Sequence, residues 1–291
     1  MKNAKTMLII SMAIFGTIGL FVRNIPLASG EIALYRAVLA AVLIGIYLLV
    51  SKQKFDFSKM KKELPLLLFS GVAMAFNWIL LFEAYKYTTV SVATLSYYFA
   101  PVIVTVVCPF LFKEKMTVKQ IVCFVMSTAG IVMITGIGDL SAGTSHFTGI
   151  LFGLGAAVLY ATVIIMNKFI KNVEGIHRTF LQFLAAIVVL VPYVLLTGGI
   201  NVQGLEWKGL VCLLIVGLIH TGVTYCLYFS SLKELPGQTV AILSYIDPLL
   251  AVLVSVTILR EPMTFWQIVG GILILGFTLW NEMPEKETTK K

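Results

Sequence analysis

A carboxylate and an imidazole interrupt two long apolar stretches of this 291-residue sequence, and both could take part in chemistry. An ionisable side chain inside a membrane costs roughly 2.5–3.5 kcal/mol on insertion scales, so any such residue is a candidate functional group. Asp247 directly precedes Pro248, which removes a backbone donor and frees a carbonyl one turn earlier. We expect Asp247 to bind a substrate ammonium or to exchange a proton; a hydrogen bond to the loosened helix is the structural alternative.

His220 and Arg36 are the other two charged or titratable candidates inside apolar stretches. Histidine titrates near physiological pH, so His220 could exchange protons together with Asp247, bind a substrate carboxylate or make an interhelical hydrogen bond. Arg36 lies about one and a half helical turns inside its stretch. Its side chain could reach the membrane interface, pair with Glu31, or bind an anionic substrate group.

Hydrogen-bonding and aromatic side chains accompany these charges. Asn77-Trp78 and Thr224-Tyr225 each place a hydrogen-bonding residue directly before an aromatic one. This pattern suits a cavity with apolar walls and few polar anchors, whose rings could contact planar or cationic solutes. Helix–helix packing and interfacial aromatic belts are the alternatives. The expected substrate-binding set is Asn77, Trp78, Tyr97, Tyr98, Tyr160, His220, Thr224, Tyr225, Tyr245 and Asp247.

The elements that must position these residues follow from the composition. Hydrophobic residues make up 59% of the chain and charged residues only 12%, with a mean hydropathy of +0.96. Soluble domains carry about 25% charged residues, so a soluble fold is excluded. A bilayer span needs roughly 20 apolar residues, and ten stretches near that length predict an all-α integral membrane protein with ten transmembrane helices. They cover residues 5–22, 30–50, 64–85, 89–112, 117–137, 148–169, 177–197, 207–231, 238–259 and 264–281.

The basic residues predict the orientation of these spans. Of the 22 Lys and Arg residues, 17 fall at the termini and in alternate loops that ten spans place on one side, and 4 fall on the other. An excess of Lys and Arg in short loops marks the cytoplasmic side. We therefore expect a plasma-membrane protein with both termini in the cytoplasm. The net charge of +8 is explained by this orientation and does not indicate nucleic-acid binding.

An internal repeat divides the sequence into two halves. Tyr98–Pro101 recurs as Tyr245–Pro248, and Lys113–Thr117 recurs as Arg260–Thr264, both at an offset of 147 residues. Each half carries five spans, an odd number, so the second half must be inserted upside down relative to the first. Inverted repeats of this kind are common in transporters, with the binding site at the midplane between them. The predicted units are a first repeat over 5–137, a second over 148–281 and a cytoplasmic tail over 282–291.

The repeated segments resemble those of the drug/metabolite transporter superfamily, EamA type. The resemblance covers about residues 5–281, and Arg36 matches an arginine often seen in the second helix of that family. It implies a metabolite or drug carrier, often an exporter, with a central cavity between the halves. The segments that carry it are Phe82–Ala93, Pro101 and Lys113–Lys115, with second copies in Tyr228–Ala241, Pro248 and Arg260–Thr264.

Together these features favour a secondary transporter for a small amphipathic metabolite, amino-acid-like or aromatic, that is exported by alternating access and driven by protons or by the substrate gradient. A multidrug or cationic-compound exporter is the alternative within the family. A membrane-embedded lipid-modifying enzyme would need paired carboxylates or a nucleophile–base pair near the interface, and no such cluster occurs. We therefore expect no enzyme activity, metal or cofactor; the expected partners are the substrate, the bilayer and protons, in a monomer or homodimer.

Overall fold

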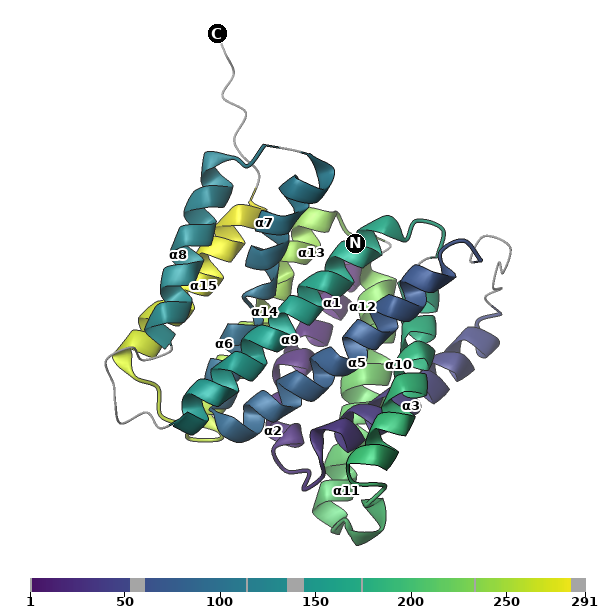
Figure 1. Ribbon diagram of the computed structural model, residues 1–291. Helices are drawn as coiled ribbons and strands as arrows, with labels where there is room; N and C mark the ends of the chain where they lie inside the picture. The colour runs from purple at the N-terminus through teal and green to yellow at the C-terminus, as the bar shows by residue number, and fades with distance from the viewer. Residues whose placement is uncertain are drawn as a thin grey trace.

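The computed structural model describes residues 2–52, 61–113, 115–134, 144–173, 175–232 and 234–283, and its helices pack side by side into one bundle (Figure 1). No strand occurs in these ranges. Glu114 of the predicted repeat, much of the basic loop at 53–60 and the tail from 284 lie outside the described residues. The elements are α1 (Lys2–Gly16), α2 (Ile18–Val22), α3 (Ser29–Val50), α5 (Leu64–Tyr87), α6 (Val90–Tyr97), α7 (Ala100–Phe112), α8 (Val118–Ile134), α9 (Thr144–Phe169), α10 (Gly175–Thr197), the short 3₁₀ turn η1 (Val202–Gly204), α11 (Trp207–Leu214), the π-helix η2 (Ile215–Val223), α12 (Thr224–Leu232), α13 (Gly237–Ser244), α14 (Ile246–Thr257) and α15 (Phe265–Glu282).

Seven helical segments are long and apolar enough to cross a membrane. The other three predicted spans are also helical: α8 has 17 residues, α13 and α14 are short helices in series, and α15 has 18 residues. Large apolar side chains cover the outside of the bundle, as Leu49, Val188 and Leu196 are 80%, 72% and 86% exposed. An apolar outer face of this kind suits contact with lipid. The seven spans are Asn3–Val22, Ser29–Val50, Leu64–Tyr87, Val90–Leu111, Thr144–Phe169, Gly175–Thr197 and Trp207–Leu232.

Two of the ten predicted spans, 89–112 and 238–259, are broken next to a proline. α6 ends at Tyr97 and α7 begins at Ala100, while α13 ends at Ser244 and α14 begins at Ile246. Pro101 and Pro248 have no backbone N–H, so neither can donate the hydrogen bond that would continue the preceding helix. The breaks leave Tyr98 and Tyr245 between helices, halfway along their segments. A third break, at Thr17, separates α1 from α2.

A π-helix occupies η2, the middle part of the α11–α12 segment. Its side chains bond to carbonyls five residues earlier, where an α-helix would offer the carbonyl four residues earlier. The hydroxyl of Thr221 donates to Val216 O at 2.8 Å, and that of Thr224 donates to Ile219 O at 2.7 Å. Both hydroxyls therefore donate to carbonyls within their own helical segment.

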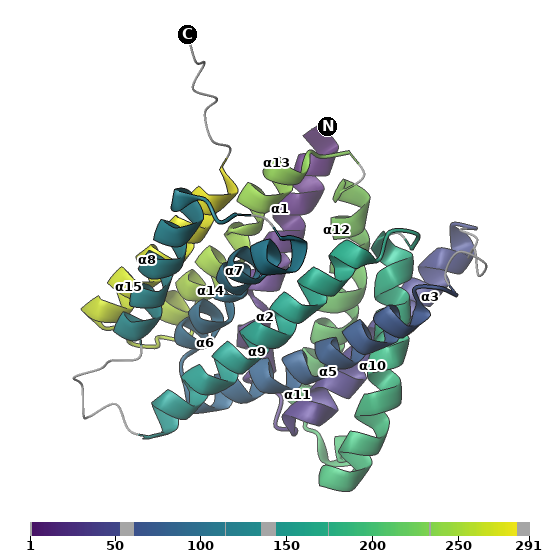
Figure 2. The ribbon, with the colours of Figure 1, turned by 45° about the horizontal axis from the view of Figure 1, so that its top comes forward.

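Helices α8 and α15 run side by side and approach closely at two glycines (Figure 2). A Cβ on Gly270 would lie 2.5 Å from the backbone oxygen of Gly130 and 2.9 Å from a side-chain carbon of Ile134. Because glycine has no side chain, the backbones of α8 and α15 can approach closely here, as in other small-residue contacts between membrane helices.

We expect the Gly270→Ala variant to be less stable, because the new methyl group must push the α8 backbone away. Overpacking of this kind costs about 1–3 kcal/mol, so the melting temperature in detergent should fall by several degrees. Gly276→Ala, in the same helix, is the matched control, because a Cβ there meets nothing within 4 Å. Equal melting temperatures for the two variants would contradict this packing.

Candidate functional site

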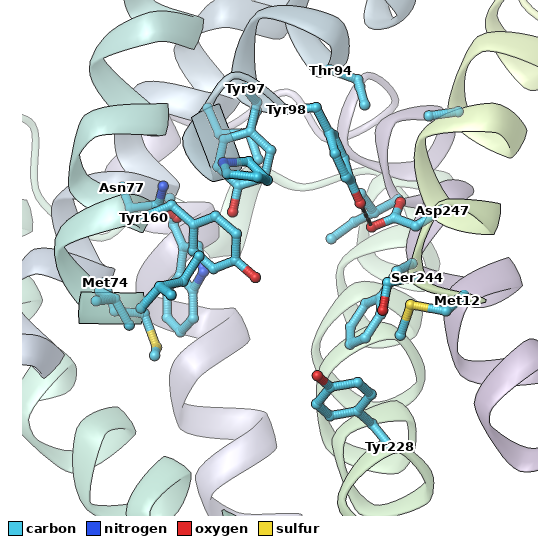
Figure 3. A pocket seen from close by; sticks show the side chains of 18 of the residues that line it. Met12, Met74, Asn77, Thr94, Tyr97, Tyr98, Tyr160, Tyr228, Ser244 and Asp247 are labelled. Atoms are coloured by element: carbon cyan, nitrogen blue, oxygen red, sulfur yellow. Dashed lines mark hydrogen bonds between the residues drawn. The ribbon is translucent and has the colours of Figure 1, made fainter. Parts of the chain in front are cut away.

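A cavity of about 350 Å³ lies at the level of the helix breaks. Figure 3 shows Tyr98 and Asp247 on one side of it, Asn77 and Tyr160 on the other, and the Tyr228 ring below. Residues far apart in sequence meet in its wall. They come from both proline breaks and from α1, α2, α3, α5, α6, α7, α9, α12, α13, α14 and α15.

The wall contains eight of the ten residues in the predicted binding set, and Arg36 as well. The broken helices explain part of this result: Tyr98 and Tyr245 lie in the breaks, and Asp247 is the second residue of α14, directly after one of them. The eight residues are Asn77, Trp78, Tyr97, Tyr98, Tyr160, Tyr225, Tyr245 and Asp247.

His220 and Thr224, the other two, lie behind the cavity wall. His220 is 2% exposed; its Nε2 lies 2.9 Å from the Thr17 hydroxyl and its Nδ1 lies 3.3 Å from Ile215 O. Thr224 is fully buried, and its hydroxyl donates to Ile219 O within the π-helix. His220 thus makes the interhelical hydrogen bond that was the structural alternative for it.

Asp247 is held by a residue from the first half of the chain. The hydroxyl of Tyr98 donates to Asp247 Oδ2 at 2.5 Å (Figure 3). The α1 helix packs directly against this turn, since a Cβ on Gly16 would lie 2.6 Å from the backbone oxygen of Asp247. Three segments therefore fix the position of the carboxylate in the wall.

Arg36 is buried in α3, with 5% of its surface exposed. Its Nε donates to the Thr221 hydroxyl at 2.6 Å, and its guanidinium carbon lies 4.6 Å from the centre of the Trp78 ring. The predicted alternative of a Glu31 partner is not found. Glu31 instead accepts a hydrogen bond from the backbone of Asn201 at 2.7 Å.

Aromatic rings form most of the remaining wall. Tyr97 and Tyr160 stack with ring centres 5.1 Å apart, and Phe15 meets Tyr225 edge-on at 5.3 Å. Asn77 also serves the fold, because its amide donates to Ala156 O at 2.7 Å and joins α5 to α9. The cavity can therefore hold a flat or apolar group between rings, with few polar groups to orient it.

A second polar network lies at one side of the bundle, where α2 ends and α6 begins. Arg23 Nη1 and Glu261 Oε1 form an ion pair at 2.5 Å, and Arg23 also donates to Thr88 O. The other oxygen of Glu261 accepts from the Val90 backbone at 2.8 Å and from the Ser255 hydroxyl. We call these five residues the Arg23–Glu261 network; they join α2, the start of α6 and the segment between α14 and α15.

The cavity wall extends to Glu282, an exposed residue at the end of α15. This end of α15 and the beginning of α1 lie on the same side of the bundle (Figure 1).

Sequence reasoning missed several wall residues, among them Met12, Phe15 and Met74. An apolar residue in an apolar helix carries no signal that separates a cavity wall from ordinary packing. Tyr228 is different, since it follows Tyr225 by three residues and so shares a helix face with it. No group of three His, Cys, Asp or Glu side chains within the described ranges is placed to hold a metal ion.

Comparisons with known proteins agree on one class. The model of the EamA-like transporter family matches residues 3–136 and 147–281. The uncharacterized transporter YxxF of Bacillus subtilis is 29% identical over 94% of this chain and 88% of its own length. An uncharacterized transporter of Archaeoglobus fulgidus is 27% identical over 97% of this chain and 98% of its own.

Two further similarities agree with these. The uncharacterized inner membrane transporter YhbE of Escherichia coli K12 is 26% identical over 77% of this chain and 70% of its own length. The crystal structure of a protein with 14% identity superposes with a TM-score of 0.66, over 94% of this chain and 95% of the other. The similarity in structure supports the helical fold, and the relatives indicate a transporter rather than an enzyme.

Proposed function

Because the chain belongs to the EamA-like transporter family and is a multi-pass membrane protein, we propose that it is a secondary transporter that exports a small amphipathic metabolite, amino-acid-like or aromatic, across the plasma membrane. The observation that carries the proposal is the cavity between the helix breaks, lined by aromatic rings and by Asp247. A carboxylate on a broken helix at this depth can exchange a proton or bind an ammonium group, as a coupled carrier requires.

The proposed architecture is ten transmembrane helices in two inverted five-helix repeats, 5–137 and 148–281. Two pairs of matched residues support it. Tyr98 and Tyr245, 147 positions apart, both lie in a break that a proline follows. Trp78 and Tyr225, also 147 positions apart, both line the cavity and both meet the Phe183 ring edge-on, with ring centres 5.3 Å and 5.5 Å away.

Alternating access is the proposed mechanism. With both termini in the cytoplasm, as the Lys and Arg distribution favours, the cavity extends toward the cytoplasmic side at Glu282. The Arg23–Glu261 network then closes the outer side. Opening of the network and closure near Glu282 would release the substrate outward.

A multidrug exporter for cationic compounds is the second candidate. Asp247 and the stacked rings of Tyr97 and Tyr160 favour it, because aromatic faces and a carboxylate attract organic cations. A screen of proteoliposomes with amino acids, nucleosides and quaternary amines separates the candidates: saturable transport of an amino acid supports the first, and transport of the amines alone supports the second. No saturable transport of any of these compounds would contradict both.

We expect Tyr225→Ala to lower the initial rate of transport of the compound found in this screen by about tenfold, which corresponds to about 1.4 kcal/mol of lost binding. The reason is the loss of the ring that faces the cavity beside Phe15. Trp266→Ala is the matched control, because Trp266 is 59% exposed on the outside of the bundle. An equal loss in both variants would mean that the cavity is not the binding site.

A further inference from the structure

Arg36 carries a charge whose burial the protein fold alone does not explain. It lines the cavity, is 5% exposed and lies within the Ser29–Val50 span. A buried charge is normally paired with a carboxylate or held by several hydrogen bonds. The ion pairs among the described residues are Arg23–Glu261 and Lys86–Glu83, and neither involves Arg36.

The nearby carboxylates have other partners. Glu31 accepts hydrogen bonds from the backbone of Ala28 and of Asn201. Asp247, which also lines the cavity, accepts a hydrogen bond from Tyr98. The positive charge of Arg36 therefore has no protein counter-ion within the described part of the chain.

The guanidinium is held in one orientation all the same. Its Nε donates to the Thr221 hydroxyl, and Thr221 is itself fixed by donating to Val216 O. The Trp78 and Phe82 rings lie 4.6 Å and 5.6 Å from its central carbon. Among the described residues the two terminal nitrogens make no hydrogen bond, so four N–H donors remain for a ligand in the cavity.

We propose that Arg36 is the subsite for a substrate carboxylate, and hence that the transported compound is a small carboxylic acid or zwitterion with an apolar or aromatic body. This inference rests on the proposed transport function and adds the substrate's charge to it. Paired guanidinium N–H groups match the two oxygens of a carboxylate. Arg36 is the only basic residue in the described cavity wall, so its single charge balances a monoanionic carboxylate better than a phosphate dianion.

For a zwitterionic substrate, Asp247 supplies the second charged group of the site, opposite in sign to Arg36. A zwitterion would place its carboxylate at Arg36 and its ammonium toward Asp247, with the body between the rings. An organic cation without a carboxylate would leave the charge on Arg36 uncompensated and would add a second positive charge to the cavity. The buried guanidinium therefore selects against the cationic drugs that the second candidate function would require.

The test uses the purified full-length protein and matched pairs of acid and amide: phenylalanine, leucine, threonine and 3-phenylpropionate, each with its amide, plus 2-phenylethylamine. Binding is measured as the ligand-dependent shift in melting temperature, which follows the ratio of ligand concentration to Kd. We expect at least one acid to bind tenfold or more tightly than its amide in the unaltered protein. If no acid binds more tightly than its amide, the inference is overturned.

Two variants then locate the effect. Arg36→Gln should remove the preference for the acid, while Arg36→Lys should keep part of it. Thr221→Val keeps the positive charge of Arg36 and removes only the hydrogen-bond acceptor of its Nε. This variant should weaken acid binding severalfold and leave a preference for the acid over its amide. It also tests the assignment if neither Arg36 variant folds. A full acid preference in Arg36→Gln, or an unchanged Kd for the acid in Thr221→Val, would contradict the assignment.

The result separates this inference from the proposed transport function. Transport of 2-phenylethylamine but of no acid would overturn the carboxylate subsite and leave a transporter of cations. Acid binding that depends on Arg36, without movement of the acid across a proteoliposome membrane, would instead contradict the transport function and leave the subsite in place.

Discussion

Asp247→Asn should abolish proton-driven accumulation of substrate in proteoliposomes, while exchange of substrate across the membrane continues. Asparagine keeps the size of the side chain and an oxygen that can accept a hydrogen bond from the Tyr98 hydroxyl, but it cannot take up a proton. One pH unit is equivalent to about 1.4 kcal/mol per proton. An imposed difference of two units should therefore drive about a hundredfold accumulation in the unaltered protein, for one proton per substrate, and none in the variant.

Tyr98→Phe is the matched control for this experiment. It removes the 2.5 Å hydrogen bond but leaves the carboxylate in place, so accumulation should still follow the pH gradient. Accumulation by Asp247→Asn at the rate of the unaltered protein would show that another group, or the substrate gradient alone, drives transport.

Glu261→Gln should open the side of the cavity that we propose the Arg23–Glu261 network to close. The carboxylate ties together Arg23, the Val90 backbone and the Ser255 hydroxyl, and it is only 8% exposed. Removing one partner of a buried pair costs about 3–5 kcal/mol; here the cost is smaller, because Arg23 is 32% exposed and its charge is screened. We expect a cysteine in place of Tyr97 to react about tenfold faster with a membrane-impermeant thiol reagent added from that side.

The reporter requires that the four native cysteines are first replaced. Glu83→Gln is the matched control, because the Lys86–Glu83 ion pair at 3.1 Å joins two residues of one helix and spans no interface between segments. Unchanged labelling in Glu261→Gln, or an equal increase in Glu83→Gln, would mean that the network does not close the cavity.

The sequence was most informative where composition or covalent structure decides the outcome. Apolar runs indicated the helical segments, and Pro248 indicated a loosened helix beside Asp247, because a missing N–H has the same consequence in any helix. The matching break beside Pro101 was not predicted. Burial of charge singled out Arg36 in the same way, although its orientation by Thr221 depends on a contact 185 residues away.

The π-helix η2 was not predictable from the sequence in this way. His220, Thr224 and Tyr225 were all expected in the binding set, and of these three only Tyr225 lines the cavity. A turn with hydrogen bonds between residues i and i+5 changes which residues share a face of the helix. No pattern in the local sequence predicts that change. The Arg23–Glu261 network could not be predicted either, because its two charged residues are distant in sequence and each resembles an ordinary loop residue.

The Tyr98–Asp247 hydrogen bond has a mechanical consequence. Its donor belongs to the first proposed repeat and its acceptor to the second, so in the proposed alternating-access cycle the bond would join two parts of the protein that move apart. A substrate ammonium or a proton that arrives at Asp247 would compete with Tyr98 for the same oxygens and weaken this hydrogen bond. By reciprocity, any movement that separates the two residues raises the affinity of the carboxylate for its new partner. In that cycle, binding at Asp247 and separation of the two halves would be coupled through the carboxylate oxygens of this residue.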